Sequence, residues 1–194
     1  KALWRGWLSD TGEPTDGRLT ANYSATPRFA LCKIASEHTD QIDAGLTNLD
    51  SKELEVIAKN LGIWKKPLSK TQHLEYKYLP VLDGHMCTYP GYQWRLLSNS
   101  VCFKQESDQI QWFYHALKPY VHYIPIKNDM SDLPEKVAWA KAHDEEVKKI
   151  AERATEFALN NLLPEDLYFY LHLTLSHYAK LQAIDFKQLN KDTK

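Results

Sequence analysis

Several features that mark other protein classes are missing from this sequence. Its three cysteines, Cys32, Cys87 and Cys102, are odd in number and widely spaced, with no CxxC pair. This pattern favours reduced thiols in a cytosolic compartment over a disulfide framework. No apolar run approaches the roughly 20 residues that cross a bilayer, and the first residues do not read as a signal peptide. With 24 Lys plus Arg against 25 Asp plus Glu, the net charge of −1 predicts no general attraction to nucleic acid or acidic membranes.

The motifs of several enzyme classes are absent as well. The chain contains neither GxGxxG nor GxxxxGKS/T, and it lacks the GxSxG of many hydrolases. Dinucleotide, P-loop and serine-hydrolase chemistry are therefore not expected. The eight histidines include no HxxxH pair, and His85 and Cys87 have no further ligand nearby in the sequence. We therefore expect no metal site.

Alternating apolar runs and helix signals predict the fold class. Hydrophobic residues make up 43% of the chain, enough for one well-packed core. Strands are expected at 1–4, 42–46, 78–82, 101–103 and 121–126, and helices near Pro27, Ser51, Ser69, Tyr89, Gln109, Ser131 or Asp132, Asp144 and Pro164. The alternation predicts an α/β protein with a Rossmann-like, largely parallel sheet and flanking helices. We expect one domain over 1–194, closing with C-terminal helices at about 144–184.

The stretch from Tyr76 to Ser107 reads as a strand, a turn, a helix and a second strand. Two parallel strands joined through a helix form a βαβ unit, and ligands of such sheets collect outside the carboxyl ends of the strands. Asp83-Gly84 follows the first of these strands, and Lys104 to Ser107 follow the second. The sequence therefore predicts a binding edge that includes Gly84 and Glu106. Glu106 could accept hydrogen bonds from ribose hydroxyls, or it could be a solvated loop carboxylate.

Two arginine-containing segments are candidates for binding phosphate. Arg5-Gly6-Trp7-Leu8-Ser9 is a glycine-containing loop after the first strand, with Arg18 beyond it. A glycine lets backbone amides approach a diphosphate, and the guanidinium fork matches phosphate oxygens. Arg95 lies in the helix expected from Tyr89, whose free amides would also favour an anion. From residue types alone, a surface or salt-bridge role is the more common one for each of these arginines.

Several short segments, in their order and spacing, resemble a known family. They are Trp4-Arg5-Gly6 with Ser9 and Arg18, Ile42 to Thr47, Tyr76 to Leu79 with Asp83-Gly84, Trp94 to Ser100, Trp112 to Tyr114, Leu117 to Pro125 and Asp129 to Leu133. Over most of its length the sequence resembles the Rumi-type protein O-glucosyltransferases and the capsule-associated glycosyltransferases of glycosyltransferase family ninety. That family includes bacterial members that modify lipopolysaccharide.

The resemblance implies the donor-binding, C-terminal domain of a GT-B glycosyltransferase. Such an enzyme transfers a sugar, here glucose or xylose, from a UDP-sugar to a saccharide or protein acceptor, with inversion and without a metal or other cofactor. In that family the loop after the first strand contacts the donor diphosphate, which assigns Gly6, Ser9 and Arg18 in this sequence. The loop and helix before Ser98-Asn99-Ser100 also hold the donor, which assigns Tyr92, Gln93, Trp94 and Arg95.

The catalytic base is not assigned within this chain. In the family it is an aspartate of the N-terminal acceptor domain, upstream of the Trp-Arg-Gly strand, and we expect that domain to be missing here. Asp43 and Asp83 are the only carboxylates that we consider as substitutes. Both also read as turn residues at strand ends.

The cellular setting and the alternatives follow from the same residues. We expect a bacterial cytoplasmic enzyme that builds surface polysaccharide or lipopolysaccharide, where a lipid-linked acceptor would bring peripheral membrane association. The alternative is a non-catalytic module that binds a nucleotide or a partner. An α/β hydrolase or deaminase of unusual motif is a further alternative, but it would need a clustered nucleophile and base that the sequence does not show.

Overall fold

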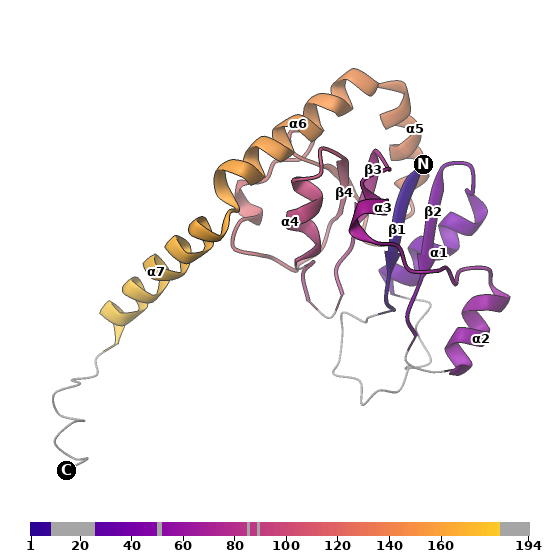
Figure 1. Ribbon diagram of the computed structural model, residues 1–194, viewed down its shortest axis with the longest axis horizontal. Helices are drawn as coiled ribbons and strands as arrows, with labels where there is room; N and C mark the ends of the chain where they lie inside the picture. The colour runs from indigo at the N-terminus through magenta and orange to yellow at the C-terminus, as the bar shows by residue number, and fades with distance from the viewer. Residues whose placement is uncertain (9–25, 50–51, 85, 89, 183–194) are drawn as a thin grey trace, which may run out of the picture. The chain divides into compact units, whose positions relative to one another are not determined.

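The computed structural model of the chain (Figure 1) describes residues 1–8, 26–49, 52–84, 86–88 and 90–182. The chain divides into two compact units, Lys1–Ala158 and Leu159–Lys194, and each is described by itself. The expectation of a single domain over the whole chain stays a prediction. All the described candidate residues lie in the first unit.

A parallel sheet forms the centre of the first unit. Its strands are β1 (Ala2–Gly6), β2 (Ile42–Leu46), β3 (Tyr78–Val81), β4 (Val101–Gln105) and β5 (Ile124–Ile126). They lie in the order β2-β1-β3-β4-β5, and every neighbouring pair is parallel, which confirms the predicted fold class. Because β2 lies on one side of β1 and β3 on the other, the strand order reverses between β1 and β3. A reversal of this kind is the switch point at which open α/β sheets bind their ligands.

Helices connect the strands, and some of the described ones begin with a side-chain cap. The helices are α1 (Pro27–Glu37), α2 (Lys52–Asn60), α3 (Lys70–His73), α4 (Gly91–Leu96), α5 (Leu133–Ala142), α6 (Asp144–Asn161) and α7 (Pro164–Leu181), with a 3-10 turn, η2, at Tyr114–Ala116. The Thr26 hydroxyl accepts a hydrogen bond from the Phe29 N–H at 3.3 Å, and Pro27 lies in the first turn of α1. Ser69 and Gln72 form a capping box at the start of α3. The predicted helix starts at Pro27 and Ser69 are therefore confirmed.

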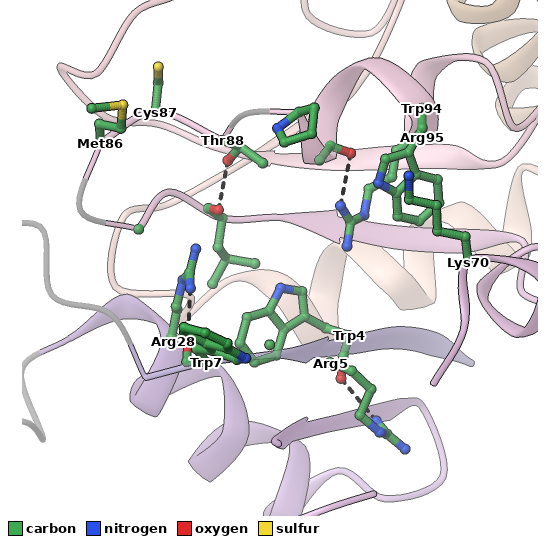
Figure 2. Close-up of a pocket in the computed structure, with 15 residues that line it drawn as sticks. Trp4, Arg5, Trp7, Arg28, Lys70, Met86, Cys87, Thr88, Trp94 and Arg95 are labelled. Atoms are coloured by element: carbon green, nitrogen blue, oxygen red, sulfur yellow. Dashed lines mark hydrogen bonds between the residues drawn. The ribbon is translucent and has the colours of Figure 1, made fainter. Parts of the chain in front are cut away.

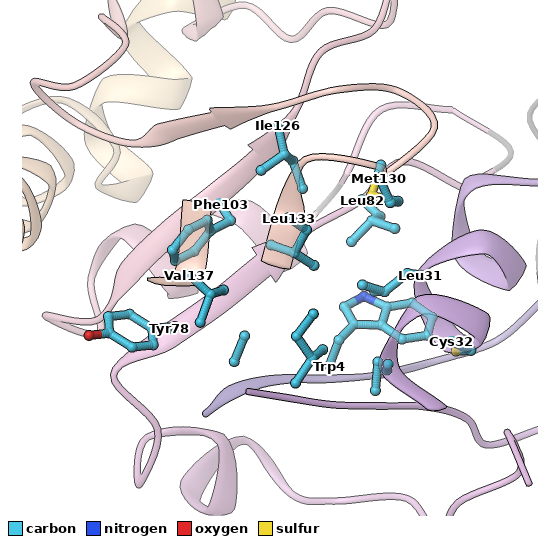
Figure 3. Close-up of a cluster of buried hydrophobic side chains, with 14 of the residues drawn as sticks. Trp4, Leu31, Cys32, Tyr78, Leu82, Phe103, Ile126, Met130, Leu133 and Val137 are labelled. Carbon is cyan, nitrogen blue, oxygen red and sulfur yellow. The ribbon is translucent and has the colours of Figure 1, made fainter. Parts of the chain in front are cut away.

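The sheet is buried on both faces, because successive strand side chains point to opposite faces. Tyr78 and Phe103 belong to the main core cluster, and their ring centroids lie 5.7 Å apart. Leu79 follows Tyr78 in β3 and pairs with Cys102, which precedes Phe103 in β4. Leu79 and Cys102 are fully buried but do not belong to that cluster. Figure 3 shows the main cluster, in which side chains of α1 and α5 pack on the strands: Leu31, Cys32, Leu133 and Val137.

One predicted helix and one predicted strand are shorter than expected. The segment 109–117 contains only η2, because Ile110 is 77% exposed whereas Phe113 is buried, so its apolar residues do not share one buried helical face. The fifth strand begins at Ile124, after Tyr120, whose φ of 57° is incompatible with an extended strand.

The second unit contains a helix with an exposed apolar surface. α7 begins at Pro164, as predicted, and none of its described side chains is buried. The apolar stripe that the sequence predicts for this helix is therefore exposed within its own unit. Its exposed apolar side chains include Leu167, Tyr168, Phe169, Leu171, Leu175 and Tyr178.

Candidate functional site

A pocket of about 540 Å³ lies at the switch point of the sheet. Its lining comes from the carboxyl end of β1, from the segment after β3, and from α1, α3 and α4. In Figure 2, Arg28 and Trp7 lie together on one side, and Lys70, Trp94 and Arg95 come together on another. The volume falls within the range of roughly 300–1,000 Å³ that is usual for small-molecule sites.

The lining of this pocket is cationic. It includes Arg5, Arg28, Lys70 and Arg95, and none of its described residues is a carboxylate. Arg5 is held by other groups, because its Nη2 donates to both carboxylate oxygens of Asp43 and its Nη1 donates to the Asp43 carbonyl, each at 2.9 Å. Arg28, Lys70 and Arg95 remain for a ligand, and we call these three residues the pocket cations.

Arg28 is positioned by two backbone carbonyls. From the first turn of α1, its Nε donates to the Asp83 carbonyl at 2.7 Å and its Nη1 donates to the Trp7 carbonyl at 3.0 Å. Burial lowers the pKa of Arg28 to about 10, and the negative charge of Asp83 opposes this shift. Arg28 therefore stays charged at neutral pH, with a partly desolvated guanidinium beside the pocket.

Arg95 is a buried cation without a described counterion. It is 7% exposed, its Nη1 donates to the Gly91 carbonyl at 2.9 Å, and its guanidinium lies 4.3 Å from the ring centroid of Trp94. Its Nε is buried with no hydrogen-bond partner among the described residues. Burial lowers the pKa of Arg95 to about 10, and the positive charge of Arg28 acts in the same direction. An anion bound between these two arginines would offset both the burial of the Arg95 charge and its repulsion by Arg28.

Two glycines allow the close packing of this site. A Cβ at Gly91 would lie 2.9 Å from Nη1 of Arg95, so a side chain there would press on the guanidinium. A Cβ at Gly6 would lie 2.5 Å from the indole of Trp4, which lines the pocket. Both positions therefore favour glycine for reasons of space.

A second pocket is less suited to an anion. It has a volume of about 490 Å³, lies beside α1 and β2, and shares no lining residue with the first. Its charged lining residues are Lys1, Lys65 and the carboxylate Asp43. Because it lies along the edge strand and not at the switch point, the first pocket is the stronger candidate.

The structure brings some of the predicted site residues to the pocket and not others. Gly6, Gly84, Trp94 and Arg95 line it, and Arg5 does so with its guanidinium turned to Asp43. Tyr92 is completely buried in the core, and Gln93 and Glu106 are not among the lining residues. The predicted diphosphate contacts Ser9 and Arg18 lie outside the described residues.

The two carboxylates considered as substitute bases do not line the pocket. Asp43 pairs with Arg5, as described above. Asp83 is 1% exposed and accepts hydrogen bonds on both carboxylate oxygens. Neither aspartate is therefore placed to remove a proton from a substrate in this pocket.

The sequence interpretation missed several lining residues, the cations Arg28 and Lys70 among them. Arg28, Lys70 and Trp7 contribute to the pocket although they were not assigned to it. A signal for Arg28 was present, because Arg28 follows the predicted helix start at Pro27. A cation in the first turn of a helix that follows a parallel strand points towards the carboxyl edge of the sheet.

The fold and the pocket together define a Rossmann-like α/β domain with a cationic pocket at its switch point. Residues 20–193 match the sequence profile of Glycosyl transferase family 90, which is most of the chain. The chain belongs to this family. The resemblance found in the sequence motifs is therefore confirmed.

Several curated relatives carry glucosyltransferase names. The chain is 39% identical over 161 residues to Protein O-glucosyltransferase 2 of Danio rerio and 38% identical over 164 residues to Protein O-glucosyltransferase 3 of Homo sapiens. Each match covers 82% of this chain and 31% of the relative. The Uncharacterized protein 179R of Invertebrate iridescent virus 6 is 33% identical over 196 residues, covering 88% of this chain and 16% of that protein. The chain thus spans a third or less of the length of these relatives.

Two solved structures share the fold. The catalytic domain of cholesterol-alpha-glucosyltransferase from Helicobacter pylori matches with a TM-score of 0.55 at 14% identity, over 82% of this chain and 97% of that one. Anabaena Alr3699/HepE, solved in complex with UDP-glucose, matches with a TM-score of 0.57 at 12% identity, over 90% of this chain and 48% of that one. These matches confirm the predicted Rossmann-like fold of the GT-B glycosyltransferases.

The described part of the chain contains neither a cluster of metal ligands nor a membrane-spanning helix. Nowhere within it do three or more His, Cys, Asp or Glu side chains gather as a metal site would require. None of the helices that the structure describes is long and apolar enough to cross a membrane.

Proposed function

We propose that this chain is the part of a glycosyltransferase that binds a UDP-sugar, with the donor diphosphate held by the pocket cations. The observation that carries the proposal is the buried guanidinium of Arg95, whose Nε has no described hydrogen-bond partner, in a pocket that Arg28 also lines and whose described lining has no carboxylate. A diphosphate supplies the negative charge and the acceptor oxygens that this arrangement lacks. The glucosyltransferase names of the relatives and the UDP-glucose bound to Alr3699/HepE support UDP-glucose as the donor, with xylose as the second candidate sugar.

The proposed reaction is an in-line displacement at C1 of the donor sugar. An acceptor hydroxyl oxygen bonds to C1 from the side opposite UDP, the bond from C1 to the diphosphate oxygen breaks, and the configuration at C1 inverts. The hydroxyl proton passes to a general base. Negative charge develops on the departing UDP, and Arg28 and Arg95 are placed to stabilise it.

Side-chain cations take the place of a divalent metal ion in this proposal. Divalent ions that bind diphosphates need carboxylate or other oxygen ligands from the protein. The described lining offers arginine and lysine instead. Binding of UDP to this chain should therefore persist in the presence of a chelator.

We assign the acceptor-binding site and the general base to parts of the enzyme outside this pocket. Asp43 and Asp83 are engaged elsewhere, and the chain covers 31% of the glucosyltransferase relatives. We therefore assign the base to a further domain, and the acceptor is a saccharide or a protein. The bacterial cytoplasmic setting and the peripheral membrane association through a lipid-linked acceptor stay predictions.

Calorimetric titration of this chain with UDP, in buffer containing EDTA, tests the proposal. Arg28→Ala should weaken UDP binding by about 1.5–3 kcal/mol, the scale of a hydrogen bond to a charged group. This corresponds to an affinity loss of about ten- to 150-fold. Arg18→Ala tests the separate sequence prediction for that residue.

Arg153→Ala is the matched control, because Arg153 is an exposed arginine of α6 that does not line the pocket. Its UDP affinity should equal that of the unaltered chain. If the folded chain binds neither UDP nor other nucleotides, the donor-binding proposal is wrong, and the non-catalytic partner-binding module becomes the better explanation.

A further inference from the structure

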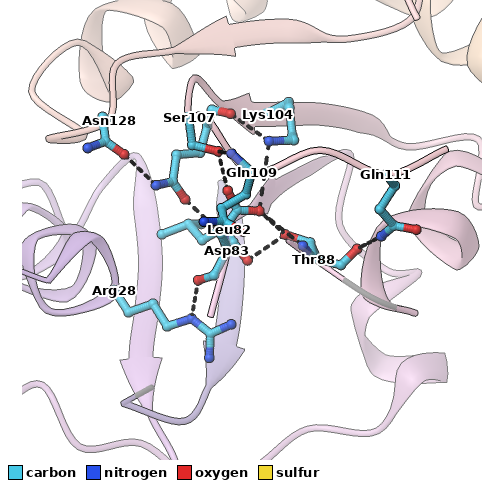
Figure 4. A network of polar contacts seen from close by, with 10 residues as sticks. Arg28, Leu82, Asp83, Thr88, Lys104, Ser107, Gln109, Gln111 and Asn128 are labelled. Carbon is cyan, nitrogen blue, oxygen red and sulfur yellow. Dashed lines mark hydrogen bonds and ion pairs between the residues drawn. The ribbon is translucent and has the colours of Figure 1, made fainter. Parts of the chain in front are cut away.

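Asp83 is the centre of a buried polar network next to the pocket (Figure 4). Its Oδ1 accepts the backbone N–H of Thr88 at 3.0 Å, and its Oδ2 accepts the hydroxyl of Ser107. Nζ of Lys104 lies 3.9 Å from Oδ1, and both of these side chains are almost fully buried. Every oxygen of this carboxylate therefore has a partner, and its charge is balanced by a buried cation.

The backbone of Asp83 is engaged as fully as its side chain. Its N–H donates to Oε1 of Gln105 at 2.8 Å, and Nε2 of Gln105 donates to Oδ1 of Asn128 at 2.6 Å. The Asp83 carbonyl accepts from Nε of Arg28 at 2.7 Å. One residue thus connects the ends of β3 and β4 to the pocket cation on α1.

Thr88 is the point at which the network reaches the pocket. Its hydroxyl oxygen lies 2.6 Å from the Leu82 carbonyl and 3.0 Å from Oδ1 of Asp83, so two acceptors share its proton. The Thr88 carbonyl accepts from Nε2 of Gln111 at 2.5 Å. Met86, Cys87 and Thr88 all line the pocket, and we call these three residues the 86–88 wall.

We infer that Asp83 is a positioning residue for the donor: its carboxylate fixes the 86–88 wall while its carbonyl fixes Arg28, so that the pocket is formed before the diphosphate arrives. The inference rests on the proposed function. A catalytic role does not fit, because the carboxylate is buried, fully hydrogen-bonded and not part of the pocket lining. Preorganised groups avoid the cost of ordering on binding, so release of this wall should weaken donor affinity.

The chain contains a natural reporter of the position of this wall. Cys32 and Cys102 are buried, whereas Cys87 is partly exposed within the 86–88 wall. Alkylation by iodoacetamide should therefore modify Cys87 first, and bound UDP should slow that reaction. Greater exposure of all three cysteines would signal unfolding, and greater exposure of Cys87 alone would signal local release of the wall.

The experiment compares the unaltered chain with Asp83→Asn and Thr88→Val, measuring UDP affinity and the rate of Cys87 alkylation. Asp83→Asn removes the charge that faces Lys104 and Thr88, and Thr88→Val keeps the side-chain shape but removes the hydroxyl. Each variant should bind UDP about ten- to a hundredfold more weakly. Each should also alkylate Cys87 faster, with less protection by UDP.

Ser100→Ala is the matched control. The Ser100 hydroxyl donates to the Tyr76 carbonyl at 2.8 Å, and Ser100 is buried just before β4, at the end opposite the pocket. This variant loses a side-chain hydrogen bond as well, so its stability should fall. Its UDP affinity and its Cys87 alkylation should not change.

The outcomes separate the inference from the proposed function. Failure of the unaltered chain to bind UDP overturns the proposed function, and this inference falls with it. Normal binding by the unaltered chain, with unchanged affinity and unchanged Cys87 alkylation in Asp83→Asn, overturns the inference alone. If Asp83→Asn exposes all three cysteines, Thr88→Val decides, and an unchanged affinity in that variant overturns the inference.

Discussion

The Asp83 network and the pocket cations are neighbouring polar regions that differ in how completely their buried groups are hydrogen-bonded and charge-balanced. The carboxylate of Asp83 is buried, and both of its oxygens accept hydrogen bonds, with Lys104 as a counterion. Arg95 is also buried, yet its Nε has no described partner and no described carboxylate faces it. Arg28 joins the two regions, because it donates to the Asp83 carbonyl and also lines the pocket.

This difference in hydrogen bonding indicates which polar groups stabilise the fold and which are available to bind a ligand. A buried charge with complete hydrogen bonding and a counterion contributes to a defined structure. A buried charge without a counterion costs stability and marks a candidate functional site. The comparison predicts that substitutions in the Asp83 network reduce both stability and donor affinity, whereas substitutions of the pocket cations reduce donor affinity without a comparable loss of stability.

Asp83→Ala should have the largest effect on stability. Removing one partner of a buried ion pair costs about 3–5 kcal/mol, because the other charge is left unpaired. Chemical denaturation measures this change as a lower free energy of unfolding. Glu55→Ala is the control, since Glu55 pairs with Lys59 on the exposed surface of α2, and such a pair is worth only about 0.3–0.5 kcal/mol. Equal effects in the two variants would contradict the structural role of the Asp83 network.

Arg95→Met should separate binding from stability. It removes a desolvated charge and keeps an apolar chain of similar length, so the free energy of unfolding should stay constant or rise. UDP binding should weaken by about 1.5–3 kcal/mol, because a charged hydrogen-bond donor is lost. Calorimetry and denaturant unfolding measure the two quantities. A loss of stability as large as that of Asp83→Ala would show that Arg95 serves the fold and not the ligand.

Gly6→Ala should moderately reduce both UDP affinity and the free energy of unfolding. The new Cβ would lie 2.5 Å from the indole of Trp4, so the ring or the end of β1 must shift. Overpacking of this kind costs roughly 1 kcal/mol or somewhat more. The same two measurements apply. Gly62→Ala is the contrast, because Gly62 has open space around it and a φ of 69°, so any cost there comes from the backbone alone and UDP affinity should be unchanged.

The dependence of UDP binding on pH should be the smallest effect near neutrality. The pKa values of Arg28 and Arg95 are lowered from 12.5 to about 10 by burial, and the charged forms bind the diphosphate. UDP affinity should therefore be nearly constant between about pH 7.5 and 9 and fall as the pH rises through about 10. The free energy of unfolding should change in the opposite direction and rise above about pH 10, because the folded chain loses these protons before the unfolded chain does. Calorimetry at several pH values measures the affinity, circular dichroism verifies the fold, and a steep fall below pH 8.5 would contradict this assignment.

Local signals in the sequence predicted much of the fold. The Pro27 start of α1 and the Ser69 start of α3 depend on neighbouring residues only, and both are present in the structure. The stretch around β3 and β4 was recognisable because its apolar runs are long enough to be buried on both faces of a sheet. The helix expected over 109–117 did not form, because spacing alone does not reveal which apolar residues the rest of the protein covers.

The site was predictable only in part. Arg95 and Gly84 were found because they belong to the strand-turn-helix stretch that the sequence shows directly. Arg28 and Lys70 were missed because they lie outside that stretch and look like ordinary surface residues of helices. The sequence placed Asp83 and the segment from Lys104 to Ser107 at one edge of the sheet. It did not show that Lys104, Gln105 and Ser107 are buried partners of Asp83, which follows from the pairing of β3 with β4.

The sequence by itself determined the α/β class, the position of two helix starts and the family, because these depend on residue types and short spacings. Only the tertiary structure decided that β1 and β3 are neighbours. That pairing creates the switch point, and it brings cations from α1, α3 and α4 around one pocket. The physical reason is that strand order and burial arise from contacts between distant segments, whereas capping and periodicity arise from residues a few positions apart.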